Sequence, residues 1–138
     1  MSRLLAIDYG LKRTGIAVTD PLKIIATALD TVRTHDLIDY LKNYLASEPV
    51  EAFIVGMPKR LDNTDTNNTR HVEAFINRLR NVFPNVPIFE HDERFTSSMA
   101  LKSMISSGYK KSDRREKGNI DKISATIILQ SYMESKGI

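Results

Sequence analysis

Short apolar runs, separated by glycine, proline and charged residues, divide the first quarter of the chain into predicted strands. Residues 4–7 form a continuous apolar run that ends at Asp8, and this pattern predicts a strand buried on both faces. A polar turn bracketed by two glycines leads into residues 16–19, which predict an antiparallel partner. Residues 24–32 predict a third strand, so the chain begins with a three-stranded meander.

Beyond residue 34 the apolar residues recur at the three- and four-residue spacing of helices. This spacing is found in residues 37–45, 72–83, 100–105 and 120–133. Thr34 or Asp36 is placed to cap the first of these helices. The centre of the last helix is apolar nearly all round, which predicts that it is well buried. Two further apolar runs, residues 52–56 and 86–89, predict strands between the helices.

The predicted order of elements is β-β-β-α-β-α-β-α-α. A meander followed by alternating strands and helices predicts an α/β fold with a mixed five-stranded sheet: a three-stranded antiparallel meander plus two parallel strands. Helices are expected on both faces of this sheet. A chain of 138 residues has the length of one ordinary domain, so we expect residues 1–138 to form a single domain.

Composition narrows the class of protein. Hydrophobic residues make up 41% of the chain and charged residues 27%, a mixture typical of a soluble globular protein. Because the chain has no cysteine, disulfides, thiolate nucleophiles and sulfur-based zinc sites are excluded, and a reducing compartment fits. No apolar run approaches the roughly 18 residues that a membrane-spanning helix needs.

The positive charge of the chain is concentrated in one segment, residues 109–117. This segment holds five basic and two acidic residues, a surplus of three, which equals the net charge of +3 of the whole chain. Two interpretations stay open for it. The segment is either a solvated loop that keeps the protein in solution, or a loop that contacts phosphates.

Carboxylates stand at three places where a segment predicted to be buried ends or begins. Asp8 ends the first strand, Asp92 and Glu93 follow residues 86–89, and Asp121 lies in the first turn of the last predicted helix. Ligand sites of open α/β sheets lie beyond the carboxyl ends of parallel strands, and Mg²⁺ prefers oxygen ligands. The residues therefore suggest a shared metal site for phosphodiester hydrolysis, or else three separate roles as a turn cap, an ion pair and a helix N-terminal charge.

Four motifs, in order, resemble one known family along nearly the whole chain. They are residues 7–18, residues 55–58, Asp-Glu-Arg-Phe-Thr-Ser at 92–97 and Ile-Asp-Lys-Ile-Ser-Ala at 120–125. The family is the YqgF (RuvX) family of Holliday-junction-resolvase-like proteins, which are also described as proposed pre-16S rRNA nucleases. The segment 92–97 is the most specific of these motifs.

The resemblance implies a ribonuclease H-like fold and a cytoplasmic, metal-dependent nuclease linked to maturation of ribosomal RNA precursors. Carried over by motif, its catalytic and metal-binding residues are Asp8, Glu93 and Asp121. We expect Asp8 to bridge two Mg²⁺ or Mn²⁺ ions, with Glu93 and Asp121 completing the shell. Two such ions stabilise the attacking and leaving oxygens of phosphodiester hydrolysis.

Basic residues near these carboxylates are candidates for contact with the substrate. Lys12 and Arg13 lie in the turn after Asp8, and the alternative for them is a solvated hairpin tip without contact to the substrate. Arg94 follows Glu93, and the alternative for it is a structural ion pair. The basic segment precedes Asp121, so we expect its cations to contact a polyanionic strand: Lys110, Lys111, Arg114 and Arg115.

Two other residues near the carboxylates have plainer expected roles. We expect Tyr9 to pack in the fold instead of stacking on a base. His91 is expected to be an ordinary residue at a strand end.

Several functions remain open at this point. RNA is the expected nucleic-acid partner, with the small ribosomal subunit precursor as a candidate, but a branched-DNA resolvase and a non-catalytic RNA- or ribosome-binding module are alternatives. The pattern from Asp8 to Gly15 also resembles the first phosphate loop of actin-like ATPases, whose ATP site needs two such domains. We expect a monomer or a homodimer and no membrane association.

Overall fold

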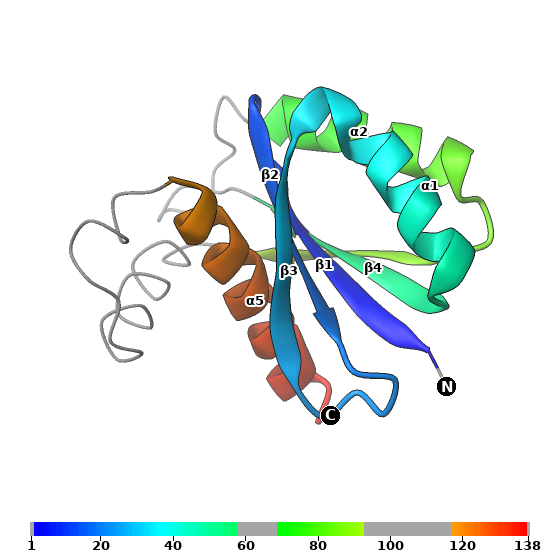
Figure 1. Ribbon diagram of the computed structural model, residues 1–138, viewed down its shortest axis with the longest axis vertical. Helices are drawn as coiled ribbons and strands as arrows, with labels where there is room; N and C mark the ends of the chain where they lie inside the picture. The colour runs from blue at the N-terminus through cyan, green and yellow to red at the C-terminus, as the bar shows by residue number, and fades with distance from the viewer. Residues whose placement is uncertain (1, 58–68, 93–116, 138) are drawn as a thin grey trace.

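The computed structural model describes residues 2–57, 69–92 and 117–137, and for residues 92 and 117–122 it describes the backbone alone. The strands are β1 (Arg3–Asp8), β2 (Arg13–Thr19), β3 (Ala26–Arg33), β4 (Val50–Met57) and β5 (Ile88–Asp92). They form one sheet in the order β3-β2-β1-β4-β5 (Figure 1). β2 is antiparallel to β1 and β3, whereas β4 is parallel to β1 and β5. The mixed five-stranded sheet predicted from the sequence is confirmed.

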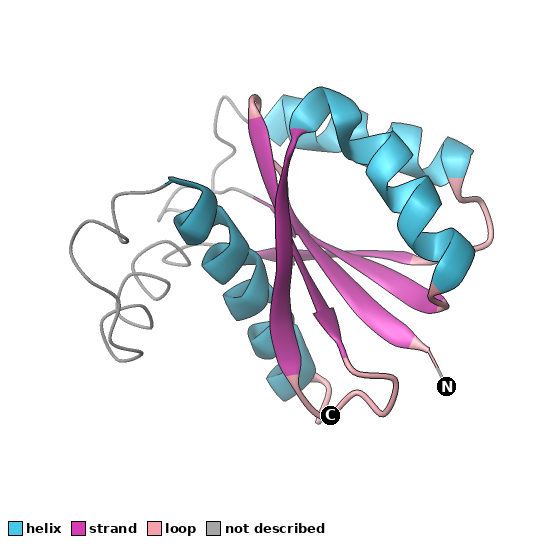
Figure 2. Cartoon of the chain, in the orientation of Figure 1, coloured by secondary structure: helices cyan, strands magenta, loops and turns pink. Residues whose placement is uncertain are grey.

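Helices cover both faces of the sheet, as the sequence predicts. A short 3-10 helix η1 (Thr34–Asp36) leads into α1 (Leu37–Ser47); α2 (Thr69–Val82) follows β4, and α5 (Lys117–Ser135) follows β5. α1 and α2 lie together on one face, and α5 crosses the opposite face (Figures 1 and 2). The helix expected near residues 100–105 lies outside the described residues.

The two-residue period of β1 divides its side chains between two apolar clusters. Leu5 and Ile7 are fully buried in the cluster beneath α1 and α2. Leu4 and Ala6 point the opposite way, into the cluster beneath α5. Because successive side chains of a strand alternate between faces, this division also fixes the side of the sheet on which later β1 residues lie.

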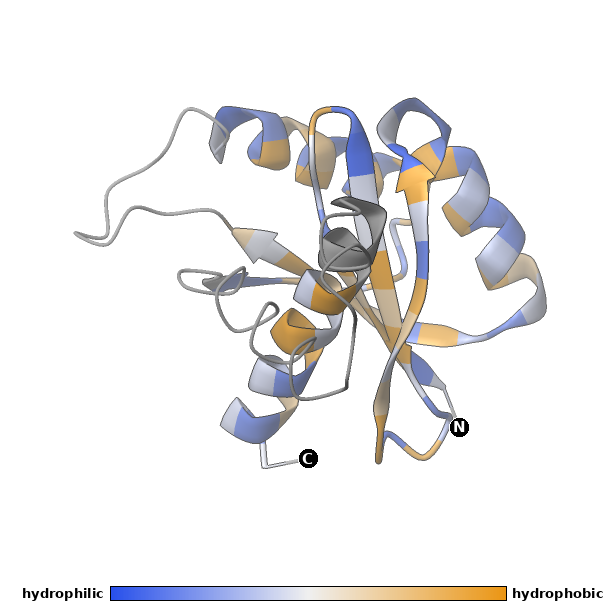
Figure 3. Cartoon of the chain, turned by 60° about the vertical axis from the view of Figure 1, so that its left-hand side comes forward, coloured by the Kyte–Doolittle hydropathy of each residue, from blue (hydrophilic) through white to orange (hydrophobic). Residues whose placement is uncertain are grey.

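The middle of α5 is buried against the sheet, which explains its apolar sequence. Ala125, Ile128 and Leu129 are fully buried beside Leu4 and Ala6 of β1. Figure 3 shows apolar residues on the middle turns of α5 and hydrophilic residues on its last turn. Among the described residues, no helix is both long and apolar enough to cross a membrane.

Two local predictions differ from the structure. β5 begins at Ile88 and continues to Asp92, beyond the expected run 86–89, because polar residues also pair with β4, as Gly56 does with His91. Asp36 occupies the N-cap position of α1 without a side-chain capping hydrogen bond. The hydroxyl of Thr34 does not cap this helix either, since it donates to the carbonyl of Gly10 at 2.6 Å.

Candidate active site

The three parallel strands β1, β4 and β5 end at one edge of the sheet, and β1 carries Asp8 there. In the register of the sheet, Ile7 of β1 lies beside Val55 of β4, and Met57 at the end of β4 lies beside Asp92 of β5. The end of β1 is therefore two strands away from the end of β5 at the same edge. Binding sites of α/β sheets form at this kind of edge.

Asp8 lies on the α5 side of this edge. It follows Leu4 and Ala6 in the alternation of β1, and both of these residues pack beneath α5. Asp8 is half-buried and pairs with Gly15 of β2 across the sheet. This pairing with β2 fixes the backbone of Asp8 before any ligand binds.

Position 121 lies on the face of α5 that packs against the sheet. Ala125, Ile128 and Tyr132 are buried at this face, and position 121 precedes Ala125 by one helical turn. α5 begins on the side of the sheet toward which β1 and β5 run (Figure 1). The backbone thus brings the first turns of α5 to the edge that carries Asp8.

Glu93 follows β5 directly, and it lies outside the described residues. So do Arg94 and four cations of the basic segment: Lys110, Lys111, Arg114 and Arg115. Within the described part of the chain, no group of three His, Cys, Asp or Glu side chains is placed to hold a metal ion. Of the three predicted metal ligands, the structure describes the side chain of Asp8 and the backbone of residue 121.

The hairpin tip after Asp8 is tied to the helical layer. Thr34, the first residue of η1, makes two hydrogen bonds to this tip. Its backbone N–H donates to the carbonyl of Lys12 at 2.9 Å, and its hydroxyl donates to the carbonyl of Gly10. A Cβ on Gly10 would lie 2.3 Å from the backbone oxygen of Arg13, so the turn requires glycine. Lys12 and Arg13 are exposed on this anchored turn, next to Asp8.

His91 lies near the end of β5 and takes part in packing between β5 and α5. Its Nε2 lies 2.8 Å from the hydroxyl of Ser131, and its ring meets Tyr132 edge-on at 6.4 Å. Phe89 stacks on the same tyrosine at 5.9 Å. Phe89 and His91 therefore both face α5.

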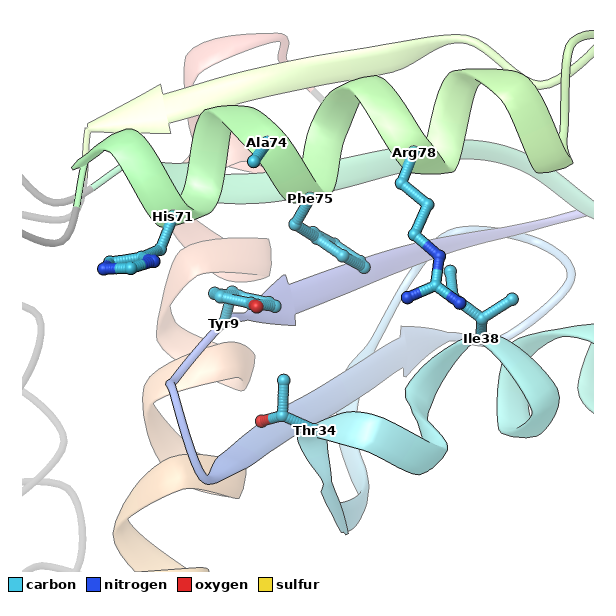
Figure 4. A pocket seen from close by; sticks show the side chains of 7 residues that line it. All are labelled: Tyr9, Thr34, Ile38, His71, Ala74, Phe75 and Arg78. Atoms are coloured by element: carbon cyan, nitrogen blue, oxygen red, sulfur yellow. The ribbon is translucent and has the colours of Figure 1, made fainter.

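A cavity of about 220 Å³, which was not predicted from the sequence, lies on the other face of β1. Its walls include Tyr9, Thr34, Ile38, His71, Phe75 and Arg78 (Figure 4). Tyr9 stacks on Phe75 with ring centroids 4.7 Å apart, which confirms that Tyr9 packs in the fold. The spacing of 71, 75 and 78 along one helix face was a usable signal, because it places two basic residues around a core aromatic.

Comparison with known proteins identifies the family. A family model described as "RuvX: Holliday junction resolvase" matches residues 2–135. The chain belongs to the RuvX family. A RuvX relative from Phocaeicola vulgatus is 55% identical over 99% of this chain and 98% of its own length, and one from Bacteroides thetaiotaomicron is 52% identical over 99% of both chains. Each is named as a proposed pre-16S rRNA nuclease.

Solved structures identify the fold. RuvC of T. thermophilus, in complex with a Holliday junction substrate, superposes with a TM-score of 0.61 over 99% of this chain and 97% of its own, at 16% identity. A second structure of Thermus thermophilus RuvC gives a TM-score of 0.55 at 14% identity. The RuvX chain therefore has the ribonuclease H-like fold expected from its motifs.

Proposed function

We propose that this RuvX protein is a metal-dependent nuclease that hydrolyses phosphodiester bonds in the precursor of 16S ribosomal RNA. The observation that carries the proposal is the placement of Asp8 at the end of β1, on the face to which the first turns of α5 also come. The names of the RuvX relatives support RNA as the substrate. We assign the activity to one domain, residues 1–138, acting in the cytoplasm.

The chemistry of Asp8 suits a divalent metal. Asp8 offers carboxylate oxygens from a fixed strand end, and oxygen donors of this kind suit Mg²⁺ or Mn²⁺. We assign the remaining ligands to Glu93 and Asp121. When bound, two ions at such a site supply charge stabilisation to the attacking and leaving oxygens of the phosphodiester.

The basic residues near Asp8 bind the phosphates of the RNA substrate. Lys12 and Arg13 come two and three positions after Gly10, on the turn that Thr34 anchors, so their backbone is held near the end of β1 that carries Asp8. We assign phosphate contacts to these two residues, to Arg94 and to the basic segment 109–117. Contacts of this kind fix the register of the strand without reading its sequence.

The experiment compares wild-type protein with Asp8→Asn on labelled pre-16S rRNA, single-stranded RNA, single-stranded DNA and a four-way DNA junction, with Mg²⁺ or Mn²⁺. Asp39→Asn is the matched control, because it removes one carboxylate from an exposed position on α1. We expect the rate of RNA cleavage to fall at least about 100-fold in Asp8→Asn, which corresponds to about 3 kcal/mol. Asp39→Asn should cleave like wild type.

A second readout separates metal binding from catalysis. Mg²⁺ or Mn²⁺ should raise the melting temperature of wild type and of Asp39→Asn, because a ligand stabilises the state that binds it. The rise should be much smaller for Asp8→Asn. Undiminished cleavage by Asp8→Asn would overturn the assignment of Asp8. Cleavage of the junction alone would make the chain a branched-DNA resolvase, and RNA binding without cleavage would make it a binding module.

A further inference from the structure

The cavity between Tyr9 and α2 has the chemistry of a nucleotide subsite. Its inner wall is apolar, since the stacked rings of Tyr9 and Phe75 and the side chain of Ile38 line it. Its rim is basic: His71 and Arg78 flank Phe75 at successive turns of α2, and Figure 4 shows both side chains at the cavity. An apolar wall suits a base, and a basic rim suits its phosphates.

The two basic side chains are available for a ligand. Both are exposed, and within the part of the chain that the structure describes, no hydrogen bond or ion pair engages either His71 or Arg78. Arg80, two residues further along the same helix, is also exposed but does not line the cavity. α2 therefore presents one arginine to the cavity and a second one elsewhere.

The size of the cavity restricts what it holds. Pockets that bind a whole small molecule usually measure about 300–1,000 Å³. The volume of about 220 Å³ is below this range. It therefore suits one unit of a polymer, whose neighbouring units bind outside the cavity, better than a free ligand whose whole surface must be buried. A strand also brings its own phosphates to the basic rim from both sides.

The position of the cavity links it to the proposed active site. Tyr9 directly follows Asp8, and the two residues diverge: Asp8 follows the residues that face α5, whereas Tyr9 packs with the cluster beneath α1 and α2. A strand that passes over this edge of the sheet meets the carboxylate on one side and the cavity on the other. Thr34, whose hydroxyl donates to Gly10, joins the cavity wall to the hairpin tip.

We propose that this cavity, lined by Tyr9, Phe75, His71 and Arg78, binds one unpaired nucleotide of the RNA strand beside the bond to be cut. The base packs against the apolar wall, and the flanking phosphates contact Arg78 and His71. The proposal deepens the proposed nuclease function and rests on it. It makes the protein prefer RNA that is unpaired next to the cleavage site.

The test measures binding of a labelled single-stranded RNA in EDTA, where metal-dependent cleavage does not take place, for wild type, Arg78→Gln and Arg80→Gln. The two variants lose the same charge from the same helix, and one of them lines the cavity. We expect Arg78→Gln to weaken binding roughly 5–10-fold and to lower the salt dependence by about one phosphate contact. Arg80→Gln should change the affinity less than twofold, and a fully paired RNA should not distinguish the two variants.

A fluorescence experiment locates the nucleotide. The chain has no tryptophan, so Tyr9→Trp places a single reporter in the cavity wall. RNA should quench this reporter, and adding Arg78→Gln to it should reduce the quenching at equal RNA concentration. Quenching by nucleoside monophosphate at the same concentration as by RNA would instead identify a free nucleotide as the occupant and overturn the proposal.

The outcomes separate this proposal from the nuclease itself. If Arg78→Gln and Arg80→Gln weaken RNA binding equally, the cavity is not a subsite, although Asp8-dependent cleavage stands. If wild type neither binds nor cleaves RNA, both proposals fail. If Arg78→Gln lowers binding of single-stranded RNA alone while Asp8→Asn abolishes cleavage, both are supported.

Discussion

Replacing Thr34 with valine tests whether the hairpin tip is held as the structure indicates. Valine has nearly the shape of threonine but no hydroxyl, so the change removes two interactions and little volume. The hydroxyl of Thr34 donates to the carbonyl of Gly10 at 2.6 Å and lies 3.0 Å from the hydroxyl of Thr14. Thr14 is fully buried, and valine at 34 leaves its hydroxyl without this partner.

The expected loss of stability follows from the cost of an unsatisfied buried polar group. That cost is about 1–3 kcal/mol, and we take about 2 kcal/mol for this site. The entropy of unfolding is about 2.1 cal/mol/K per residue, or about 0.29 kcal/mol/K for 138 residues. A loss of about 2 kcal/mol therefore lowers the melting temperature by about 7 °C.

Thermal and urea unfolding of four proteins measure this effect: wild type, Thr34→Val, Thr34→Ser and the double variant Thr14→Val/Thr34→Val. Serine keeps the hydroxyl, so Thr34→Ser should lie within about 1 kcal/mol of wild type, the value of one buried methylene. The double variant should lose less stability than the two single substitutions to valine lose together, because the two hydroxyls share one interaction. If Thr34→Val has the same melting temperature as wild type, or if Thr34→Ser is destabilised as much as Thr34→Val, the hydroxyl does not anchor the tip.

Three further predictions concern the rest of the described fold. Burial, together with the neighbouring Asp30 carboxylate, raises the pKa of Tyr40 to about 12, so the fold should lose stability as pH rises from about 10 through 12, and Tyr40→Phe should remove that loss in alkaline urea titrations. Phe53→Ala should cost about 3–5 kcal/mol by calorimetry, because the ring is fully buried and contacts Phe83; an unchanged melting temperature would contradict this packing. Hydrogen bonds from backbone N–H groups, foremost that of Ile25, lower the pKa of Asp20, so its contribution to stability should be present above pH 3.8, disappear at lower pH, and be absent in Asp20→Ala.

Most of the fold was predictable because burial repeats at a fixed period along each element. The apolar run before Asp8 predicted β1, and the long stripe from Val72 onward predicted α2, since each pattern suits one kind of backbone. The end of β5 was not predictable in this way. Glu90 and His91 are polar, but their backbone pairs with β4 in a register that no side-chain pattern announces.

The acidic residues of the candidate site are predicted from the sequence and stay a prediction, whereas the cavity was not predicted. Asp8 stands at the end of an apolar run, which is a local signal, and the family motif adds Glu93 and Asp121. The cavity depends on Tyr9, Thr34 and Arg78, three residues brought together from separate elements. Thr34 likewise bonds to Gly10, 24 positions earlier in the chain, so the local rule for helix caps misassigned its hydroxyl.

The cluster beneath α5 joins parts of the chain that lie far apart in sequence, and this has a consequence for the order of folding. Leu4 and Ala6 of β1 pack with Ala125 and Leu129 of α5, about 120 positions later. Contacts between residues so distant in sequence close a large loop, and the entropy lost in closing it slows their formation. We therefore expect the α5 side of the sheet to form late in refolding, after β1, β2 and β3 have paired through their short connections.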